Sequence, residues 1–451
     1  MYVTNKLTNP RPYRTPPATE VTVVDVRTQR VTERKVFHSA HVLEGVDFTP
    51  SGDWAMVTLM RPKNLLPATQ VNRGWMITNG IGIIERKPGG RLIQLLLDQP
   101  NAYYADPYDI LITPDGKRAF VSHAGADKIS VIDLDGLKEL IASASSDDLA
   151  TYANHLGMSR HYVIKRIPTG SNPKRLALSP DGQRLYVAER LQDRISIIDV
   201  SRLEVVGTID LGGPEKVSLT RRGRRLFHNA GFTYQNQYSC RSCHPDEHED
   251  ALVYDLEPDG LGRNLLNNRS LRDIGRTPPY KWNGKNTSLY MMDGIRFAKW
   301  LTRTNPFPPE DLQSLVAFIT RKIEQPPNRF RQMNGELTAA QKRGKTIFER
   351  SITNAGRPIP PENRCVTCHP APNYTNALKA DVGTLSELDT PMQFDNPQLV
   401  NVYASPPYLH DGRAQTLEEI WTRHNPDDRH GVANDLTKEQ LNDLIEYLRS
   451  L

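Results

Sequence analysis

The first 216 residues carry short runs of alternating apolar and polar residues, broken at intervals by turn signals. Three segments share a pattern of two short strands joined by Pro-Ser-Gly or Pro-Asp-Gly: 45–57, 108–121 and 174–187. These turn residues suit a tight connection, so each segment predicts a β-hairpin. A further apolar run follows each hairpin and predicts a third strand: 81–84, 129–134 and 195–200.

The spacing of these hairpins predicts a partial β-propeller at 1–216. The turn glycines Gly52, Gly116 and Gly182 are 64 and 66 residues apart, whereas a propeller blade usually repeats every 40–45 or so residues. The excess predicts insertions at 61–78 and 136–160, the second of them helical. With a partial blade at 1–40, the pattern gives about four blades in an all-β domain.

The second half has a helical pattern instead. Apolar residues recur at i, i+3, i+4 and i+7 in 439–448, and a similar segment lies at 310–319. Both patterns predict amphipathic helices. Each would close one copy of a small helical module.

Several segments show that this half is duplicated. Gly223-Arg-Arg-Leu-Phe matches Gly344-Lys-Thr-Ile-Phe, and Pro278-Pro-Tyr-Lys-Trp-Asn-Gly matches Pro406-Pro-Tyr-Leu-His-Asp-Gly. The duplication predicts two all-α domains, 217–330 and 331–451, after the β domain at 1–216.

The composition narrows the classes of function. The chain has 57 Lys and Arg against 52 Asp and Glu, a net charge of +5. The basic cluster at 221–225 lacks the interleaved aromatics of a nucleic-acid surface, so we expect no nucleic-acid partner. No apolar run approaches the roughly 18 residues of a membrane span, so we expect no transmembrane segment.

All four cysteines fall into two identical patterns. Cys240 and Cys243 precede His244, and Cys365 and Cys368 precede His369. Cys-x-x-Cys-His is the attachment signature of c-type haem. The two thiols form thioethers to one haem, and the histidine binds its iron as the proximal ligand. The sequence therefore predicts two covalently bound haem c groups.

Three alternatives compete with this interpretation. A zinc site would need the two cysteine pairs to converge as four thiolates. A thioredoxin-like redox pair would need a βαβ setting, which neither motif has. A chance occurrence would have to account for two complete motifs that use every cysteine of the chain.

The second half resembles the di-haem cytochrome c peroxidase family, which includes the tryptophan-tryptophylquinone maturation enzymes. The resemblance rests on the paired motifs and on Pro-Tyr-Leu-His-Asp-Gly-Arg-Ala-Gln-Thr-Leu-Glu-Glu at 407–419. It implies an oxidoreductase in which a donor redox protein reduces the C-terminal haem. Electrons then pass to the N-terminal haem, where hydrogen peroxide reacts. The alternative is a non-catalytic electron carrier that uses the propeller as a docking platform.

The same resemblance implies roles for individual residues. Trp282 corresponds to the tryptophan between the haems, with an ordinary core aromatic as the alternative. At the second haem the template places His424 as the sixth iron ligand, with His430 and Met392 as weaker alternatives. His410, in the Leu-His-Asp-Gly turn, is interpreted as structural.

At the first haem, Met291 and Met292 are candidate distal ligands, with core packing as the alternative. The family's distal glutamate has no clear counterpart, and Thr302 lies nearest the expected place. Relatives hold calcium between the haem modules, which makes Asn268 and Asn396 candidate contributors.

The first half resembles the YVTN propeller family through Tyr2-Val-Thr-Asn and the blade pattern above. A closed propeller usually has six to eight blades, and covalent haem attachment takes place outside the cytoplasm. We therefore expect a protein of the periplasm or another exported compartment, whose upstream blades and signal peptide are missing from this chain. A four-bladed unit closed by partner chains is the alternative.

Overall fold

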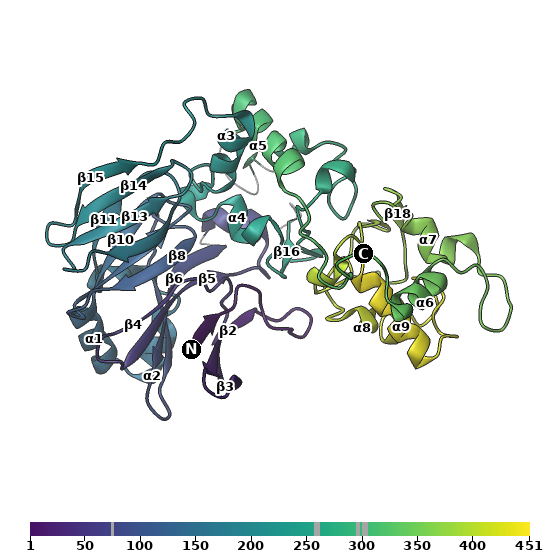
Figure 1. The fold of residues 1–451 in the computed structure, drawn as a ribbon, viewed down its shortest axis with the longest axis horizontal. Helices are drawn as coiled ribbons and strands as arrows, with labels where there is room; N and C mark the ends of the chain where they lie inside the picture. The colour runs from purple at the N-terminus through teal and green to yellow at the C-terminus, as the bar shows by residue number, and fades with distance from the viewer. Residues whose placement is uncertain (74–75, 257–261, 295–297, 300–304) are drawn as a thin grey trace.

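The computed structural model describes residues 1–73, 76–256, 262–294, 298–299 and 305–451. The first half consists of four antiparallel sheets that follow one another along the chain (Figure 1). The first two sheets contain β1 (Tyr2–Thr4), β2 (Ala18–Asp25) and β3 (Arg30–His38), then β4 (Val46–Phe48), β5 (Trp54–Pro62), β6 (Ile77–Glu85) and β7 (Leu92–Leu96). The other two contain β8 (Pro107–Ile112), β9 (Arg118–His123), β10 (Lys128–Asp133) and β11 (Val163–Pro168), then β12 (Pro173–Leu178), β13 (Arg184–Glu189), β14 (Arg194–Asp199) and β15 (Glu204–Asp210).

The predicted hairpins are confirmed as β4–β5, β8–β9 and β12–β13. Their turns end on glycines with positive φ, 78° at Gly52, 68° at Gly116 and 70° at Gly182, a conformation that favours glycine. The predicted third strands are β6, β10 and β14, and each sheet adds a fourth strand that the sequence pattern did not single out.

Burial of the second sheet departs from simple alternation. Every residue of β5 and of β6 is buried. On one face, Met56 joins a core with residues of the third sheet, such as Val121. On the other face, Val57 packs with residues of the first sheet, such as Phe37. Neighbouring sheets cover both faces of β5, so its polar positions are buried as well.

The two predicted insertions contain helical turns. The insertion between β10 and β11 folds into α1 (Leu134–Ser143), α2 (Ser146–Tyr152) and a 3-10 turn at Leu156–His161. The insertion between β5 and β6 holds a 3-10 turn at Ala68–Arg73, and residues 74 and 75 lie outside the described part of the chain.

The second half contains two similar helix pairs, α3 (Leu219–Phe227) with α5 (Pro309–Lys322) and α6 (Ala339–Phe348) with α9 (Lys438–Arg449). A glycine makes each crossing close: a Cβ at Gly223 would lie 1.9 Å from the oxygen of Ser314, and one at Gly344 would lie 1.9 Å from that of Asp443. The predicted closing helices are thus confirmed, and Thr437 caps the second one with a capping box.

Short elements connect these helices. The cysteine motifs form two short helices, α4 (Cys240–Cys243) and α7 (Cys365–Cys368). Each module also has a small hairpin, β16 (Val253–Asp255) with β17 (Leu265–Asn267) in the first and β18 (Lys379–Ala380) with β19 (Phe394–Asp395) in the second. In the second module, α8 (Leu417–Thr422) precedes α9. Figure 1 shows α4 beside the strand sheets and the second module at the far end of the molecule.

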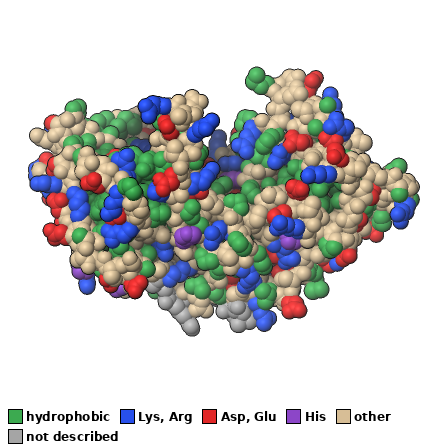
Figure 2. All heavy atoms as spheres, turned by 90° about the horizontal axis from the view of Figure 1, so that it is seen from below, with side chains coloured by type: hydrophobic (Ala, Val, Ile, Leu, Met, Phe, Trp, Pro, Cys, Tyr) green, Lys and Arg blue, Asp and Glu red, His purple; other side chains and the backbone are tan. Residues whose placement is uncertain are grey.

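Figure 2 shows one face of the molecule, on which basic and acidic side chains are interspersed and a hollow separates two lobes. Among the described residues, no helix is both long and apolar enough to cross a lipid bilayer.

Candidate haem sites

The first attachment motif lies on α4, a single helical turn that ends at His244. The Nδ1 atom of His244 lies 2.9 Å from the carbonyl oxygen of His248. A carbonyl only accepts, so Nδ1 donates and Nε2 carries the free lone pair. Burial lowers the pKa of His244 to about 4, so the ring is neutral near pH 7. This imidazole has the form that binds a haem iron.

The second motif repeats this geometry on α7. The Nδ1 atom of His369 lies 2.9 Å from the carbonyl oxygen of Tyr374, and the His369 side chain is buried. Burial also lowers the pKa of His369. Both predicted proximal histidines are therefore held in the same tautomer, each by a backbone carbonyl a few residues further along the chain.

The two cysteine pairs do not converge. Burial raises the pKa of Cys240 to about 12 and that of Cys365 to about 11. Within the described ranges, no three His, Cys, Asp or Glu side chains gather into a metal-ion site, whereas the zinc alternative needs four thiolates at one place.

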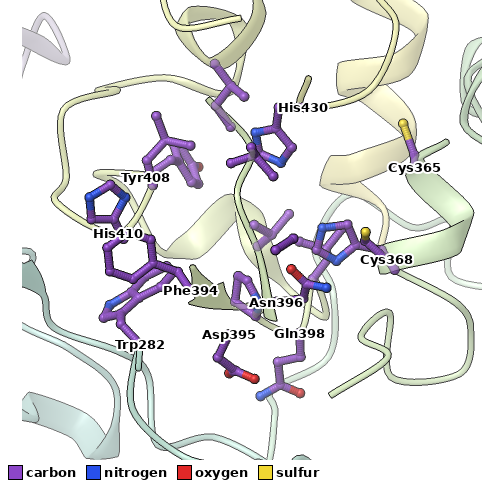
Figure 3. A pocket seen from close by; sticks show the side chains of 18 of the residues that line it. Trp282, Cys365, Cys368, Phe394, Asp395, Asn396, Gln398, Tyr408, His410 and His430 are labelled. Atoms are coloured by element: carbon purple, nitrogen blue, oxygen red, sulfur yellow. The ribbon is translucent and has the colours of Figure 1, made fainter. Parts of the chain in front are cut away.

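A cavity of about 610 Å³ adjoins the second motif, and we call it the central cavity (Figure 3). Its lining includes Cys365, Cys368 and His369 from the second module and Asn268 and Trp282 from the first. Cofactor cavities usually measure about 300–1,000 Å³. The central cavity thus has the size and the attachment groups for a haem, and it lies where the two modules meet.

His430 lines the central cavity (Figure 3). Two hydrogen bonds hold the loop that carries His430. The Trp421 indole N–H donates to the His430 carbonyl at 3.0 Å, and the His430 N–H donates to Asn425 Oδ1 at 2.7 Å. The Nδ1 atom of His430 is buried with no hydrogen-bond partner among the described residues. Burial lowers its pKa to about 4, with a further contribution from the nearby His369. If a haem is bound here, His369 and His430 are two imidazoles of the cavity lining that could bind its iron.

The template residue His424 has a different place. It follows α8, which ends at Thr422, and it is not among the residues that line the central cavity. Met392 is 73% exposed. Of the three candidates from the sequence, His430 lines the central cavity, whereas His424 and Met392 do not.

The candidate distal residues of the first haem have unequal surroundings. Met291 is 47% exposed, and its sulfur lies 3.8 Å from the Thr287 hydroxyl. Met292 packs against the apolar cluster that also contacts Cys240. Thr302 is outside the described residues.

Equivalent turns of the two modules meet and exchange hydrogen bonds. The N–H of Asn267 donates to the carbonyl of His410 at 2.7 Å, and the N–H of Asp395 donates to the carbonyl of Trp282 at 2.7 Å. In the duplication Asn267 corresponds to Asp395, and Trp282 corresponds to His410. The two contacts are therefore one contact repeated by a local twofold relation between the modules.

An aromatic stack lies at this junction (Figure 3). The rings of Trp282 and His410 meet edge to face with centroids 6.5 Å apart, and those of His410 and Phe394 stack at 3.8 Å. The Trp282 indole N–H donates to the Asn267 carbonyl at 2.7 Å, and His410 Nε2 lies 3.2 Å from the Asp389 carboxylate. The stack, which we call the Trp282 stack, links the first module to the lining of the central cavity.

The strand sheets hold α4 through buried polar contacts. The hydroxyls of Ser239 and Ser242 each donate to Asp106 at 2.6 Å. Arg241 forms an ion pair with Glu44 and lies 3.8 Å from Asp106. Arg241, Asp106 and both serines are at most 1% exposed. We call this set of contacts the α4 clamp.

Sequence analysis missed this clamp. Its one sequence signal is the polar pair Arg241-Ser242 between two cysteines of a buried helix. The partner Asp106 precedes Ser239 by 133 residues, and nothing in the local pattern joins them. Only the fold brings the sheets to the first motif.

The two asparagines considered for calcium are used within their own modules. Asn268 donates to the Cys243 carbonyl at 2.5 Å and to Asp250 at 3.1 Å. Asn396 donates to Asn376 Oδ1 at 2.8 Å. Both line the central cavity. Calcium between the modules stays a prediction.

No protein-family model matches the chain. The chain is 34% identical over 178 residues to hydrazine synthase subunit beta of Kuenenia stuttgartiensis, and this alignment covers 40% of the chain and 46% of the subunit. It is 30% identical over 291 residues to hydrazine synthase subunit gamma of the same organism, and this alignment covers 53% of the chain and 79% of the subunit. The chain belongs to the gamma-subunit family.

A solved structure of a MauG-like protein associated with microbial copper homeostasis is 19% identical, with a TM-score of 0.41 over 54% of this chain and 91% of that one. The chain spans about half the length of the beta subunit. Its relatives are thus two different subunits of one enzyme.

Proposed function

We propose that the chain is a di-haem c-type cytochrome oxidoreductase and a redox subunit of a hydrazine synthase-type assembly. One haem c would be held at 240–244 and the other at 365–369. Each haem, when bound, supplies a one-electron couple at its iron. Membership of the gamma-subunit family supports this proposal, as do two imidazoles whose Nδ1 atoms each lie 2.9 Å from a backbone carbonyl.

The observation that carries the proposal is the Trp282 stack. Trp282 comes from the first module, yet it lines the central cavity together with His369. We propose that electrons cross between the haems through Trp282 and His410. The direction, from a donor redox protein through the C-terminal haem to the N-terminal haem, follows from the family resemblance, as does hydrogen peroxide as a substrate.

The residues around the two proposed haems would have different roles. His369 and His430 would hold the second iron from both sides, which suits a haem that only passes electrons. His244 would hold the first iron, with Met292 as its candidate distal ligand. The α4 clamp would fix the first haem against the sheets, so that the chemistry of this haem depends on the first half of the chain.

We also propose that the chain joins counterparts of two subunits. The gamma subunit matches 53% of the chain, about the share of 217–451, and the beta subunit matches 40%, which fits within 1–216. The proposed domains are a propeller-like unit at 1–216 and haem modules at 217–330 and 331–451. Covalent haem attachment supports an exported, periplasmic location, and the family supports protein partners.

Inter-haem electron transfer tests the proposal. The holoprotein should contain two haems per chain by pyridine haemochrome assay. After rapid reduction of the second haem, transfer to the first should be slower in Trp282→Phe by on the order of tenfold, equivalent to about 1.4 kcal/mol. The control is Trp54→Phe, because Trp54 packs in the core of the strand sheets and does not line the central cavity. Equal transfer rates in Trp282→Phe and the native protein would contradict the route.

A further inference from the structure

A buried tyrosine that the proposed electron route does not use lies beside the first motif. Tyr254, on β16, is 4% exposed and packs among apolar residues such as Met60 and Ile77. Its hydroxyl donates to Asp250 Oδ2 at 2.5 Å. A phenol hydrogen-bonded to a carboxylate within a protein core is a short, strong contact.

The surroundings of Asp250 suit a carboxylate that accepts a proton. It is fully buried, and its other oxygen accepts from the Leu252 N–H at 3.1 Å and from Asn268 Nδ2 at 3.1 Å. His41, also fully buried, lies 3.9 Å from Asp250 Oδ2. Burial raises the pKa of Asp250 to about 6 and raises the pKa of Tyr254. Near pH 7 the phenol therefore keeps its proton while the carboxylate is ionised.

This pair touches the atoms that would carry the haem. The Tyr254 hydroxyl is also within hydrogen-bonding reach of the Cys243 sulfur. Asn268, which binds Asp250, donates to the Cys243 carbonyl at 2.5 Å. When the haem is attached, that sulfur is part of its thioether link, so the phenol lies against the edge of the first haem.

The second module provides an internal comparison. Asn268 and its counterpart Asn396 donate to Asp250 and Asn376 respectively. The hairpin registers are also equivalent, with Val253 opposite Asn267 and Lys379 opposite Asp395. Asn376 and Ala380 therefore stand where the first module has Asp250 and Tyr254. At these equivalent positions, the first module has a phenol and a carboxylate, whereas the second module has a methyl group and an amide.

We propose that Tyr254 is a redox-active side chain that supplies an electron to the first haem, with Asp250 as the acceptor of its proton. The inference rests on the proposed function in that it takes this haem as present. Reduction of one hydrogen peroxide to two waters takes two electrons and two protons. Tyr254 would supply one of these electrons and the haem, when bound, would supply the other, and the two protons come from solvent.

The step at Tyr254 is balanced within the pair. The phenolic O–H bond breaks, the electron passes to the haem, and the proton forms a new O–H bond on Asp250 Oδ2. The products are a neutral tyrosyl radical and a carboxylic acid. Return of one electron and transfer of the same proton restore the starting pair.

Freeze-quench EPR of the holoprotein tests this proposal. After mixing with one equivalent of hydrogen peroxide, we expect a tyrosyl signal that changes its splitting when the protein contains ring-deuterated tyrosine. The signal should be lost in Tyr254→Phe and reduced in Asp250→Asn. Tyr238→Phe is the matched control, because Tyr238 lies in the same apolar cluster near Cys243, and it should keep the signal. A signal that persists in Tyr254→Phe, or is lost in Tyr238→Phe, would overturn the assignment.

A second oxidant separates this proposal from the proposed function. Photogenerated ruthenium(III) tris-bipyridine oxidises tyrosines whether or not a haem reacts with peroxide. A Tyr254 radical with ruthenium but not with peroxide would support the redox tyrosine and contradict peroxide chemistry. No tyrosyl signal with either oxidant, in a protein with both haems, would overturn the redox tyrosine and leave the di-haem assignment standing.

Discussion

At the scale of single residues, the axial ligand of the second haem gives the clearest prediction. His430→Ala should convert the second haem from low spin to high spin, because one of its two imidazoles is removed. Electronic absorption and EPR of the oxidised holoprotein measure the change. The first haem should keep its spectrum.

His424→Ala is the matched control for this substitution. His424 lies six residues earlier and does not line the central cavity, so both spectra should stay as in the native protein. A converted spectrum in His424→Ala with an unchanged one in His430→Ala would restore the family template.

The residues around the second haem also show which parts of a site the sequence alone can predict. Cys365, Cys368 and His369 are adjacent in the chain, so their spacing alone predicts their chemistry. His430, the distal ligand we propose, comes from a loop whose backbone is bonded by Asn425 and Trp421. Counting residues from a motif cannot follow such a path, so the family template points to His424 while the cavity lining points to His430.

At the scale of elements, the helix crossing of the second module depends on Gly344. Gly344→Ala should lower the free energy of unfolding by about 1–3 kcal/mol, the usual cost of overpacking, because the added Cβ would meet the Asp443 carbonyl. Urea unfolding of the holoprotein measures the loss. Lys342→Ala, on the exposed side of the same helix, should leave the midpoint unchanged.

The hairpin between β6 and β7 gives a prediction for acid stability. Glu85 is buried and accepts hydrogen bonds from Arg91, including one of 2.7 Å, which lower its pKa from 4.5 to about 2. The folded state therefore binds this proton less readily than the unfolded state. The stability from this pair is complete above about pH 4.5 and is lost as the pH falls toward 2.

Glu85→Gln should remove this contribution. The free energy of unfolding at pH 7 should fall by about 1–2 kcal/mol, less than the full shift implies because Arg91 is partly exposed to solvent. The decline between pH 4.5 and 2 should become shallower. Glu204→Gln, on the exposed strand β15, should keep the native slope, and an unchanged slope in Glu85→Gln would refute the pairing.

Elements with local signals were predictable, and elements covered on both faces were less so. Pro-Asp-Gly located the hairpins at Gly116 and Gly182 because a turn is decided by its own residues. The complete burial of β5 was not predictable, because it results from sheets on either side. The 3-10 turn in the first insertion carried no periodic signal.

At the scale of the whole molecule, the α4 clamp joins the two halves. Asp106→Ala leaves the Ser239 and Ser242 hydroxyls without their acceptor, while Arg241 keeps its ion pair with Glu44. Leaving a buried polar group unpaired costs about 1–3 kcal/mol. We expect lower stability and a higher reduction potential of the first haem, because a nearby negative charge is lost. The second haem should keep its potential.

Potentiometric titration of both haems, with urea unfolding, checks this prediction. Asp53→Ala removes a carboxylate from an exposed turn of the sheets and should change neither potential. An equal shift of both haems in Asp106→Ala would mean that the clamp acts on the whole fold rather than on the first site. The clamp was not predictable, because it joins residues more than a hundred positions apart.

The burial of α4 bears on the order of biosynthesis if the first haem is attached as proposed. Arg241 and Ser242 are each 1% exposed and Cys240 and Cys243 are partly buried, so the docked helix presents little surface to a haem-attaching enzyme. We therefore expect thioether formation at Cys240 and Cys243 to precede docking of α4 on the strand sheets. The central cavity is lined from both modules, so the second proposed haem would be attached before these modules close. On this proposal, two haems are attached to an unfolded chain before its halves assemble.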